Sequence, residues 1–199
     1  MLPRRNPTPL RISTKTLTME HCQAILVRKS RWSESSLLIT WMTDTFGTLK
    51  TSARGALRAG SPFAGKVDLF HNAEITFTLS RSSSLHSLRE ISLLKPFDAP
   101  RATYQTVALA SYFSELCAAV APPMQPAHGL HGLLARALTH LASSPPTRKA
   151  FDHFEKETAR LLGILDQSGK TTPPSALTQL CGKLPLSRQT ALAACKQNK

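Results

Sequence analysis

Hydrophobic and polar residues alternate along the first half of the chain. Within residues 73–80, Ile75, Phe77 and Leu79 would face one side of a strand, and the residues between them would face the other side. Similar short segments, several of them rich in β-branched residues, continue to residue 97. The predicted strands cover residues 23–28, 36–43, 47–53, 66–70, 73–80 and 85–97. Five or six short strands in so short a stretch are typical of a small β-barrel.

The hydrophobic period changes to that of a helix after residue 97. Leu109, Phe113, Leu116 and Val120 recur at the spacing that places them on one helical face. Further helices are predicted over residues 130–141, 151–165, 175–181 and 187–197. The pattern therefore predicts an α+β chain in which a barrel domain (19–97) precedes an all-helical domain (98–199).

Composition supports a packed core and an intracellular setting. Of the 199 residues, 41% are hydrophobic, which argues against global disorder. No apolar run approaches the roughly 18 residues of a membrane span, and no signal peptide is recognisable, so we expect a cytoplasmic protein without membrane contact.

Residues 1–18 carry four cations and no acid. They are predicted to form a disordered basic arm; a transit peptide, or a true start at Met19, is the alternative.

The charge balance favours a polyanionic partner. Lys and Arg number 25 against 12 acids, a formal net charge of +13. Such an excess raises the affinity for nucleic acid, although a generally basic proteome would give the same balance. The barrel cations that we expect to contact phosphates are Arg28, Lys29, Arg31, Lys50, Arg54, Arg58 and Lys66.

Two tryptophans are assigned different roles. Trp32 lies among cations in "RKSRWSES", outside any apolar run, so it is the candidate for stacking on an unpaired base. Trp41 lies inside "LLITWMT" and is predicted to belong to the core. Because the other expected contacts are cations, binding should show little sequence preference and should weaken steeply with salt.

Motifs for enzymatic chemistry are missing from the sequence. Gly55 and Gly60 have the spacing of a phosphate-binding loop, but Ser61 and Pro62 stand where Lys and Ser/Thr are needed. The four cysteines form no CxxC pair, so free thiols are expected and a zinc site is not. The sequence has no GxSxG, no HExxH and no closely spaced carboxylate pair. We predict no catalytic residues, no metal and no cofactor; a nuclease is the weakest alternative.

The helical half suggests a second kind of function. Its third predicted helix carries charges, including Glu155 and Arg160, on the side away from its apolar residues. An apolar groove between such helices, rimmed by cations, would suit a short acidic and hydrophobic peptide. The alternative function is therefore an interaction adaptor that binds acidic tails and whose barrel is only structural.

Several motifs resemble those of the bacterial RecO family of recombination mediators. Trp32, Glu34 and Ser35 are similar to an aromatic-x-Glu-Ser motif that follows the family's first strand. Residues 43–47 match its Thr-acid-x-x-Gly turn, and residues 53–56 match its small-basic-Gly-Ala element. The likeness continues through "YFSEL" (112–116) and "FEKETARLLGIL" (154–165), and it is most specific over its first third.

The resemblance implies an OB-fold barrel followed by a helical domain. It also implies binding of single- and double-stranded DNA, annealing of complementary strands, and replacement of single-strand binding protein by RecA at the bacterial nucleoid. The partners that it implies are RecR and the acidic C-terminal tail of single-strand binding protein. Many relatives carry a zinc module of two CxxC pairs, and only "LCGK" (180–183) faintly resembles it here, so zinc is not expected.

Overall fold

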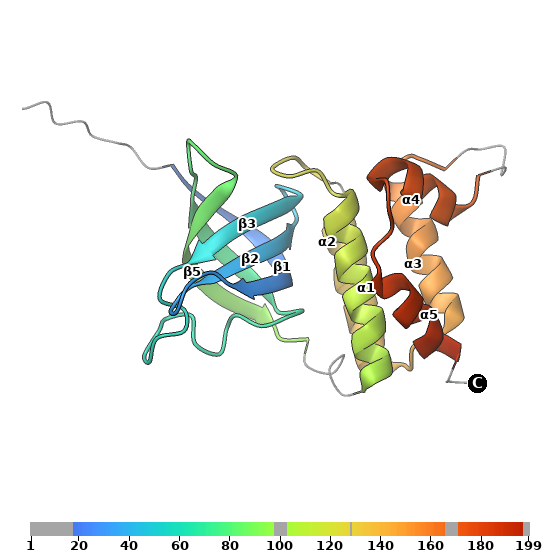
Figure 1. Cartoon of the computed structure of the whole chain (residues 1–199), viewed down its shortest axis with the longest axis horizontal. Helices are drawn as coiled ribbons and strands as arrows, with labels where there is room; N and C mark the ends of the chain where they lie inside the picture. The colour runs from blue at the N-terminus through green and yellow to red at the C-terminus, as the bar shows by residue number, and fades with distance from the viewer. Residues whose placement is uncertain (1–17, 98–102, 128, 166–170, 197–199) are drawn as a thin grey trace, which may run out of the picture.

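A computed structural model describes residues 18–97, 103–127, 129–165 and 171–196 (Figure 1). The predicted basic arm lies outside the described residues except for Thr18, and most of the predicted domain boundary also lies outside them. Figure 1 shows a barrel on the left and a group of helices on the right. The predicted α+β fold, a five-stranded barrel followed by helices, is confirmed.

Five strands close the barrel. They are β1 (Met19–Arg31), β2 (Leu37–Thr43), β3 (Thr48–Ala53), β4 (Asn72–Thr78) and β5 (Leu85–Lys95). Neighbouring strands follow the order β1-β2-β3-β5-β4, and β4 pairs again with β1. All pairs are antiparallel except β3 with β5, whose short parallel contact completes the closure.

The interior of the barrel is filled by residues that alternate along the strands, as the sequence pattern predicts. Leu26, Ile39 and Phe77 are fully buried there, and so is Trp41. The Trp41 indole N–H donates a hydrogen bond to Thr51 Oγ1 at 2.8 Å, which satisfies its polar group away from water. The predicted core role of Trp41 is confirmed.

One predicted strand is wrong. Residues 66–70 form turns between β3 and β4 rather than a strand. The Asp68 carboxylate accepts a hydrogen bond from the Leu69 N–H at 2.8 Å, and Phe70 has a φ of 69°. A left-handed residue interrupts a strand, so the run "VDLF" supplies one buried side chain, Phe70, and two partly buried ones, Val67 and Leu69, without strand pairing.

Five helices follow the barrel. They are α1 (Tyr104–Val120), α2 (Leu130–Ser143), α3 (Arg148–Leu161), α4 (Pro173–Cys181) and α5 (Ser187–Lys196). Thr103 begins α1 with a reciprocal hydrogen-bond pair to Thr106, and Thr147 begins α3 by accepting from the Ala150 N–H. The third helix ends at Leu161 rather than at the predicted residue 165, because the backbone turns left-handed at Gly163, where φ is 66°.

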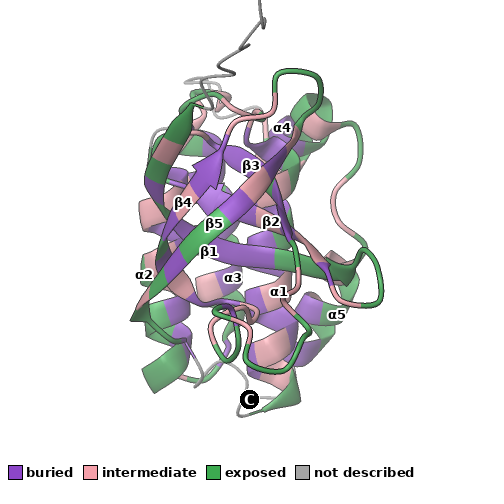
Figure 2. Cartoon of the chain, turned by 90° about the vertical axis from the view of Figure 1, so that its left-hand side faces the viewer, coloured by how far each residue is buried: buried purple, intermediate pink, exposed green. Residues whose placement is uncertain are grey.

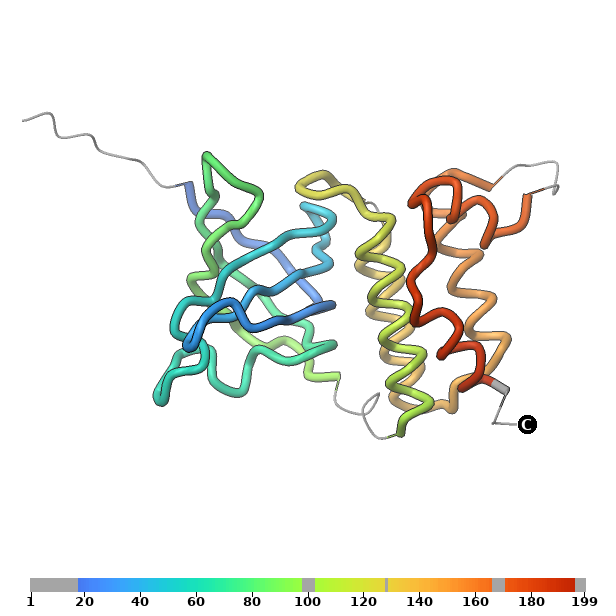
Figure 3. Tube along the Cα trace, viewed as in Figure 1, coloured from blue at the N-terminus to red at the C-terminus, as the bar shows by residue number. Residues whose placement is uncertain are grey.

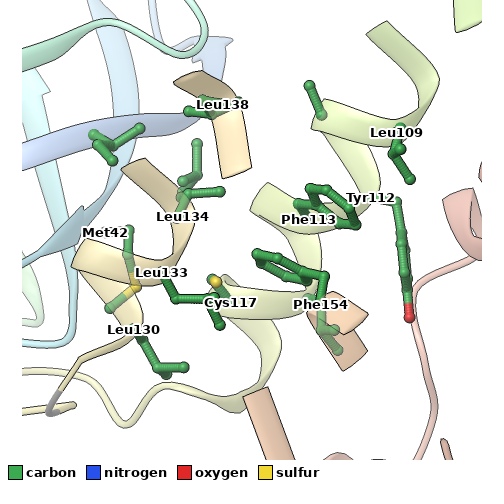
Figure 4. Close-up of a cluster of buried hydrophobic side chains, with 14 of the residues drawn as sticks. Met42, Leu109, Tyr112, Phe113, Cys117, Leu130, Leu133, Leu134, Leu138 and Phe154 are labelled. Carbon is green, nitrogen blue, oxygen red and sulfur yellow. The ribbon is translucent and has the colours of Figure 1, made fainter. Parts of the chain in front are cut away.

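A second hydrophobic cluster, distinct from the barrel interior, joins the barrel to the helices. Ile25 and Met42, on the outer face of the barrel, belong to the cluster that α1 and α2 form. Figure 4 shows Met42 among the leucines of α2. A β-bulge between Leu26 and Arg28 leaves Val27 in the same cluster. The two halves are therefore packed together by apolar side chains.

A second junction is made by residues 121–127, which we call the α1–α2 connection. Figure 3 shows it above the turn between β2 and β3. The Thr48 N–H donates to Pro122 O at 3.2 Å, the Thr48 hydroxyl donates to Ala121 O at 3.1 Å, and the Met124 N–H donates to Thr48 O at 3.1 Å. Gly47 in the turn has a φ of 58°, and the connection lies directly against its backbone.

Candidate nucleic-acid interface

A groove of about 1140 Å³ crosses the barrel surface, and we call it the barrel groove. Its lining residues come from the β1–β2 loop (32–36), from residues 52–58, from residues 78–89 around the β4–β5 loop, and from Thr18 and Met124. Figure 2 views the barrel from the side opposite the helices, where these loops are mostly exposed. In OB-folds the corresponding loops and the adjacent strand faces bind oligonucleotides.

The charge of the barrel groove is of one sign. Arg54, Arg58, Arg81 and Arg89 line it, and none of its described lining residues is Asp or Glu. Most of the other lining residues carry hydroxyl groups. The Arg89 Nε–H donates to Thr78 Oγ1 at 2.7 Å, which fixes the guanidinium over the junction of β4 and β5. The arrangement suits a chain of phosphates.

The β1–β2 loop presents Trp32 to solvent. Its side chain is 60% exposed, although tryptophan is highly buried on average. The loop is closed by a hydrogen bond from the Trp32 N–H to Ser36 O at 2.9 Å, and the Arg31 guanidinium donates to Glu34 O at 3.2 Å. These bonds fix the loop backbone and leave the exposed indole ring available for stacking on a base.

Three of the eight contact residues predicted from the sequence line the barrel groove, and five do not. Trp32, Arg54 and Arg58 line the barrel groove together. The remaining five candidates do not line it: Arg28, Lys29, Arg31, Lys50 and Lys66.

These five lie at several places on the barrel. Lys29 forms an ion pair with Asp68 at 2.6 Å. Arg28 and Lys50 are both in register with Thr40, so they share the outer face of β1, β2 and β3. Lys50 also pairs with Leu85, a lining residue, and therefore lies next to the groove.

Two lining arginines were not singled out from the sequence. Arg81 lies in the β4–β5 loop and Arg89 lies at a bulge of β5, opposite the end of β4. The segment "SRSSSLHSLRE" offered a signal, because a serine-rich basic turn between two strands is polar at its tip. The pairing of β5 with β3 and β4 places this loop in the same groove as Arg54, and the local sequence does not specify that pairing.

A buried histidine supports the β4–β5 loop. His86 is 4% exposed, and its Nδ1 accepts a hydrogen bond from the Ser80 N–H at 3.0 Å. Burial lowers the pKa of His86 below its usual value. The neutral ring is the form that can accept this bond, so the neutral state holds the loop beside the groove.

The helices form a second groove of about 660 Å³ between α2 and α3, which we call the helix groove. Apolar side chains, among them Phe113, Leu133 and Phe154, line its base. Its cationic residues are Arg136 from α2 and Lys149 from α3. Glu157 of α3 also lines it, so the helix groove combines an apolar base with two cations and one carboxylate.

Metal and thiol chemistry find little support among the described residues. No group of three or more His, Cys, Asp or Glu side chains there could hold a metal ion. All four cysteines are free thiols, as predicted. Burial raises the pKa of Cys22 and of Cys117 to about 12, which keeps both thiols protonated at neutral pH. None of the described helices is long and apolar enough to span a bilayer.

Comparison with known proteins identifies the family. Residues 18–97 match the family model described as recombination protein O N terminal, and residues 101–165 match the model described as recombination protein O C terminal. The two matches together cover well over half of the chain.

Curated relatives agree with the two models. A DNA repair protein RecO from Xanthomonas oryzae pv. oryzae (strain PXO99A) is 28% identical over 169 residues, which are 82% of this chain and 69% of the relative. The protein of the same name from Desulforudis audaxviator is 32% identical over 150 residues, 74% of this chain and 58% of that protein. The one from Rhodopirellula baltica is 25% identical over 160 residues, 80% of this chain and 57% of that protein. With its barrel, its helices and both family matches in the same order, this chain belongs to the RecO family of DNA repair proteins.

Proposed function

We propose that the chain binds single-stranded DNA in the barrel groove and acts as a mediator of recombinational repair. The observation that supports this most strongly is the lining of the groove: four arginines, an exposed tryptophan and no described acid. Arginine side chains pair with phosphates, whereas the indole ring gains from an unstacked base. Arg28, Arg31, Lys50 and Lys66, which lie outside the groove, remain proposals as secondary phosphate contacts. Lys29 is set apart from them, because its ammonium is paired with Asp68.

The charge of the groove sets the expected salt dependence. Each phosphate neutralised on single-stranded DNA contributes about 0.7 to the slope of log affinity against log salt. If all four arginines make such contacts, they contribute about 2.8 to that slope, and removal of two of them lowers it by about 1.4. A solvated cation that makes no phosphate contact leaves the slope unchanged.

The experiment is fluorescence anisotropy of a labelled single-stranded oligonucleotide across a salt series. The double variant Arg54→Ala with Arg58→Ala should weaken binding and flatten the slope by about 1.4. Lys29→Ala is the matched control, because Lys29 is a barrel cation paired with Asp68 outside the groove. An unchanged slope in the double variant, or the same loss in Lys29→Ala, contradicts the proposed site.

Annealing and strand exchange form the finer part of the proposal. A groove that binds the sugar–phosphate chain and stacks few bases leaves base edges available for a complementary strand. We therefore expect the protein to accelerate annealing, and the groove variants to lose this activity together with binding. Partnership with RecR, delivery of RecA and a nucleoid-associated location belong to the same proposal. A strand-annealing assay with quenched fluorophore pairs measures the first step directly.

The helix groove supports a second binding function. We propose that it takes the acidic and hydrophobic tail of single-strand binding protein, as the adaptor alternative requires. The apolar base would contact the hydrophobic end of the tail, and Arg136 and Lys149 would neutralise its carboxylates. A labelled acidic peptide should bind the parent protein and should bind Arg136→Ala with Lys149→Ala several-fold more weakly. A salt-independent interaction, or equal binding to both proteins, argues against this site.

A further inference from the structure

One lining residue of the barrel groove comes from the helical half of the chain. Met124 belongs to the α1–α2 connection, and its N–H donates to Thr48 O at 3.1 Å at the start of β3. Its side chain packs against the hydrophobic cluster of the barrel and also lines the groove. The groove is therefore completed by both halves of the chain.

The backbone of Met124 adopts an uncommon conformation. Its φ is 55°, in the left-handed region that few non-glycine residues occupy. Such a residue persists when its surroundings fix it, and strained residues of this kind gather at binding sites. Here the hydrogen bonds to Thr48 hold the connection in place, and the side chain is directed to the groove.

The chemistry of the methionine differs from that of the groove around it. Arginines and hydroxyl groups can contact the phosphates of single strands and duplexes alike. A flexible thioether gains instead from an apolar surface, and DNA offers such a surface on the faces of unstacked bases. In a duplex these faces are stacked on their neighbours.

We propose that Met124 is an apolar contact for an unpaired base and that it favours single-stranded over duplex DNA. This inference rests on the proposed function of the barrel groove. It assigns to the helical half a direct part in selecting the form of DNA, in addition to packing against the barrel.

The test compares anisotropy titrations of a labelled single strand and of its duplex at one salt concentration. Met124→Ala should weaken single-strand binding by about three- to tenfold, as loss of a partly buried apolar contact predicts, and should change duplex binding by less than about twofold. Met124→Gly should give the same result in a variant whose backbone accepts a positive φ without strain. Met124→Leu, which keeps an apolar side chain, should retain most of the preference.

Thr48→Val is the matched control for a general loosening of the connection. It removes the hydroxyl hydrogen bond to Ala121 O but removes no lining residue. Equal losses for single strands and duplexes in Met124→Ala, or the same single-strand loss in Thr48→Val, overturn the inference. If the Met124 variants bind normally while Arg54→Ala with Arg58→Ala is weakened, the inference fails and the proposed function stands; if the arginine variant also binds normally, both fail.

Discussion

The contact between Gly47 and the α1–α2 connection gives a sharp prediction about how the two halves are joined. A Cβ atom added at Gly47 would lie 2.3 Å from Pro122 O and 2.4 Å from Gln125 O. Both are backbone atoms, which cannot rotate out of the way as the end of a side chain can. Gly47→Ala therefore forces the connection away from β3.

The expected destabilisation has two contributions. Holding alanine at a φ of 58° costs about 1–2 kcal/mol. Displacing the connection disrupts the three hydrogen bonds that join Thr48 to it, each worth about 0.5–1.5 kcal/mol. The two contributions sum to a fall of about 2.5–6.5 kcal/mol in the free energy of unfolding, which is at the upper end for one substitution.

Gly60→Ala is the matched control. Gly60 also has a positive φ, 73°, but a Cβ atom there would meet nothing within 4 Å. Its expected loss is the backbone cost alone, about 1–2 kcal/mol. Urea unfolding followed by circular dichroism measures both variants. If Gly47→Ala loses no more stability than Gly60→Ala, the connection does not hold the barrel and the helices together as described.

Three further predictions concern the interior of the protein. Arg188→Ala should lower the free energy of unfolding by about 3 kcal/mol in urea unfolding. The carboxylate of Glu155 is only 2% exposed, and the substitution removes its ion pair with Arg188 at 2.7 Å. Addition of Glu155→Gln should recover part of this loss, because it removes the buried charge. Burial lowers the pKa of His86 in the folded protein, so the unfolded state binds more protons below about pH 6.5. The free energy of unfolding should therefore fall as the pH is lowered from 7 towards 5. His86→Gln should show a smaller fall in the same titration. Iodoacetamide at pH 8 should label the half-buried Cys181 of the native protein before the fully buried Cys117. Mass spectrometry of digests measures the order of labelling. Faster labelling of Cys117 would contradict the packing of α1.

Local patterns were sufficient to predict the elements of the fold but not all of their boundaries. The period-two alternation that buries Ile75 and Phe77 and the helical spacing that buries Leu109 both reflect burial on one face. The apolar run at 66–70 was misassigned because hydrophobicity alone does not distinguish a strand from a buried turn. Only the left-handed backbone of Phe70 makes that distinction, and the sequence gives no sign of it.

The candidate site was predicted where it depends on short loops and was missed where it depends on closure of the barrel. Trp32 and Arg54 stand out through their polar, cationic or glycine-rich neighbours. Arg81 reaches the same groove because β5 pairs with both β3 and β4, and no local pattern specifies those pairings. Met124 depends on an even longer separation, because its position is set by contact between the two halves of the chain.

The packing of α5 against α1 has a consequence for folding during translation. Leu177 of α4 and Ala191 of α5 complete the core that α1 begins, and Arg188 reaches back to Glu155 of α3. At about 5–20 residues per second, the ribosome adds α5 roughly 5–20 s after the last barrel strand. The barrel can close during that interval, whereas the nascent helices must keep an apolar face exposed until α5 emerges. In the cell, slow translation of this stretch should therefore expose the helical half, rather than the barrel, to chaperones and proteases.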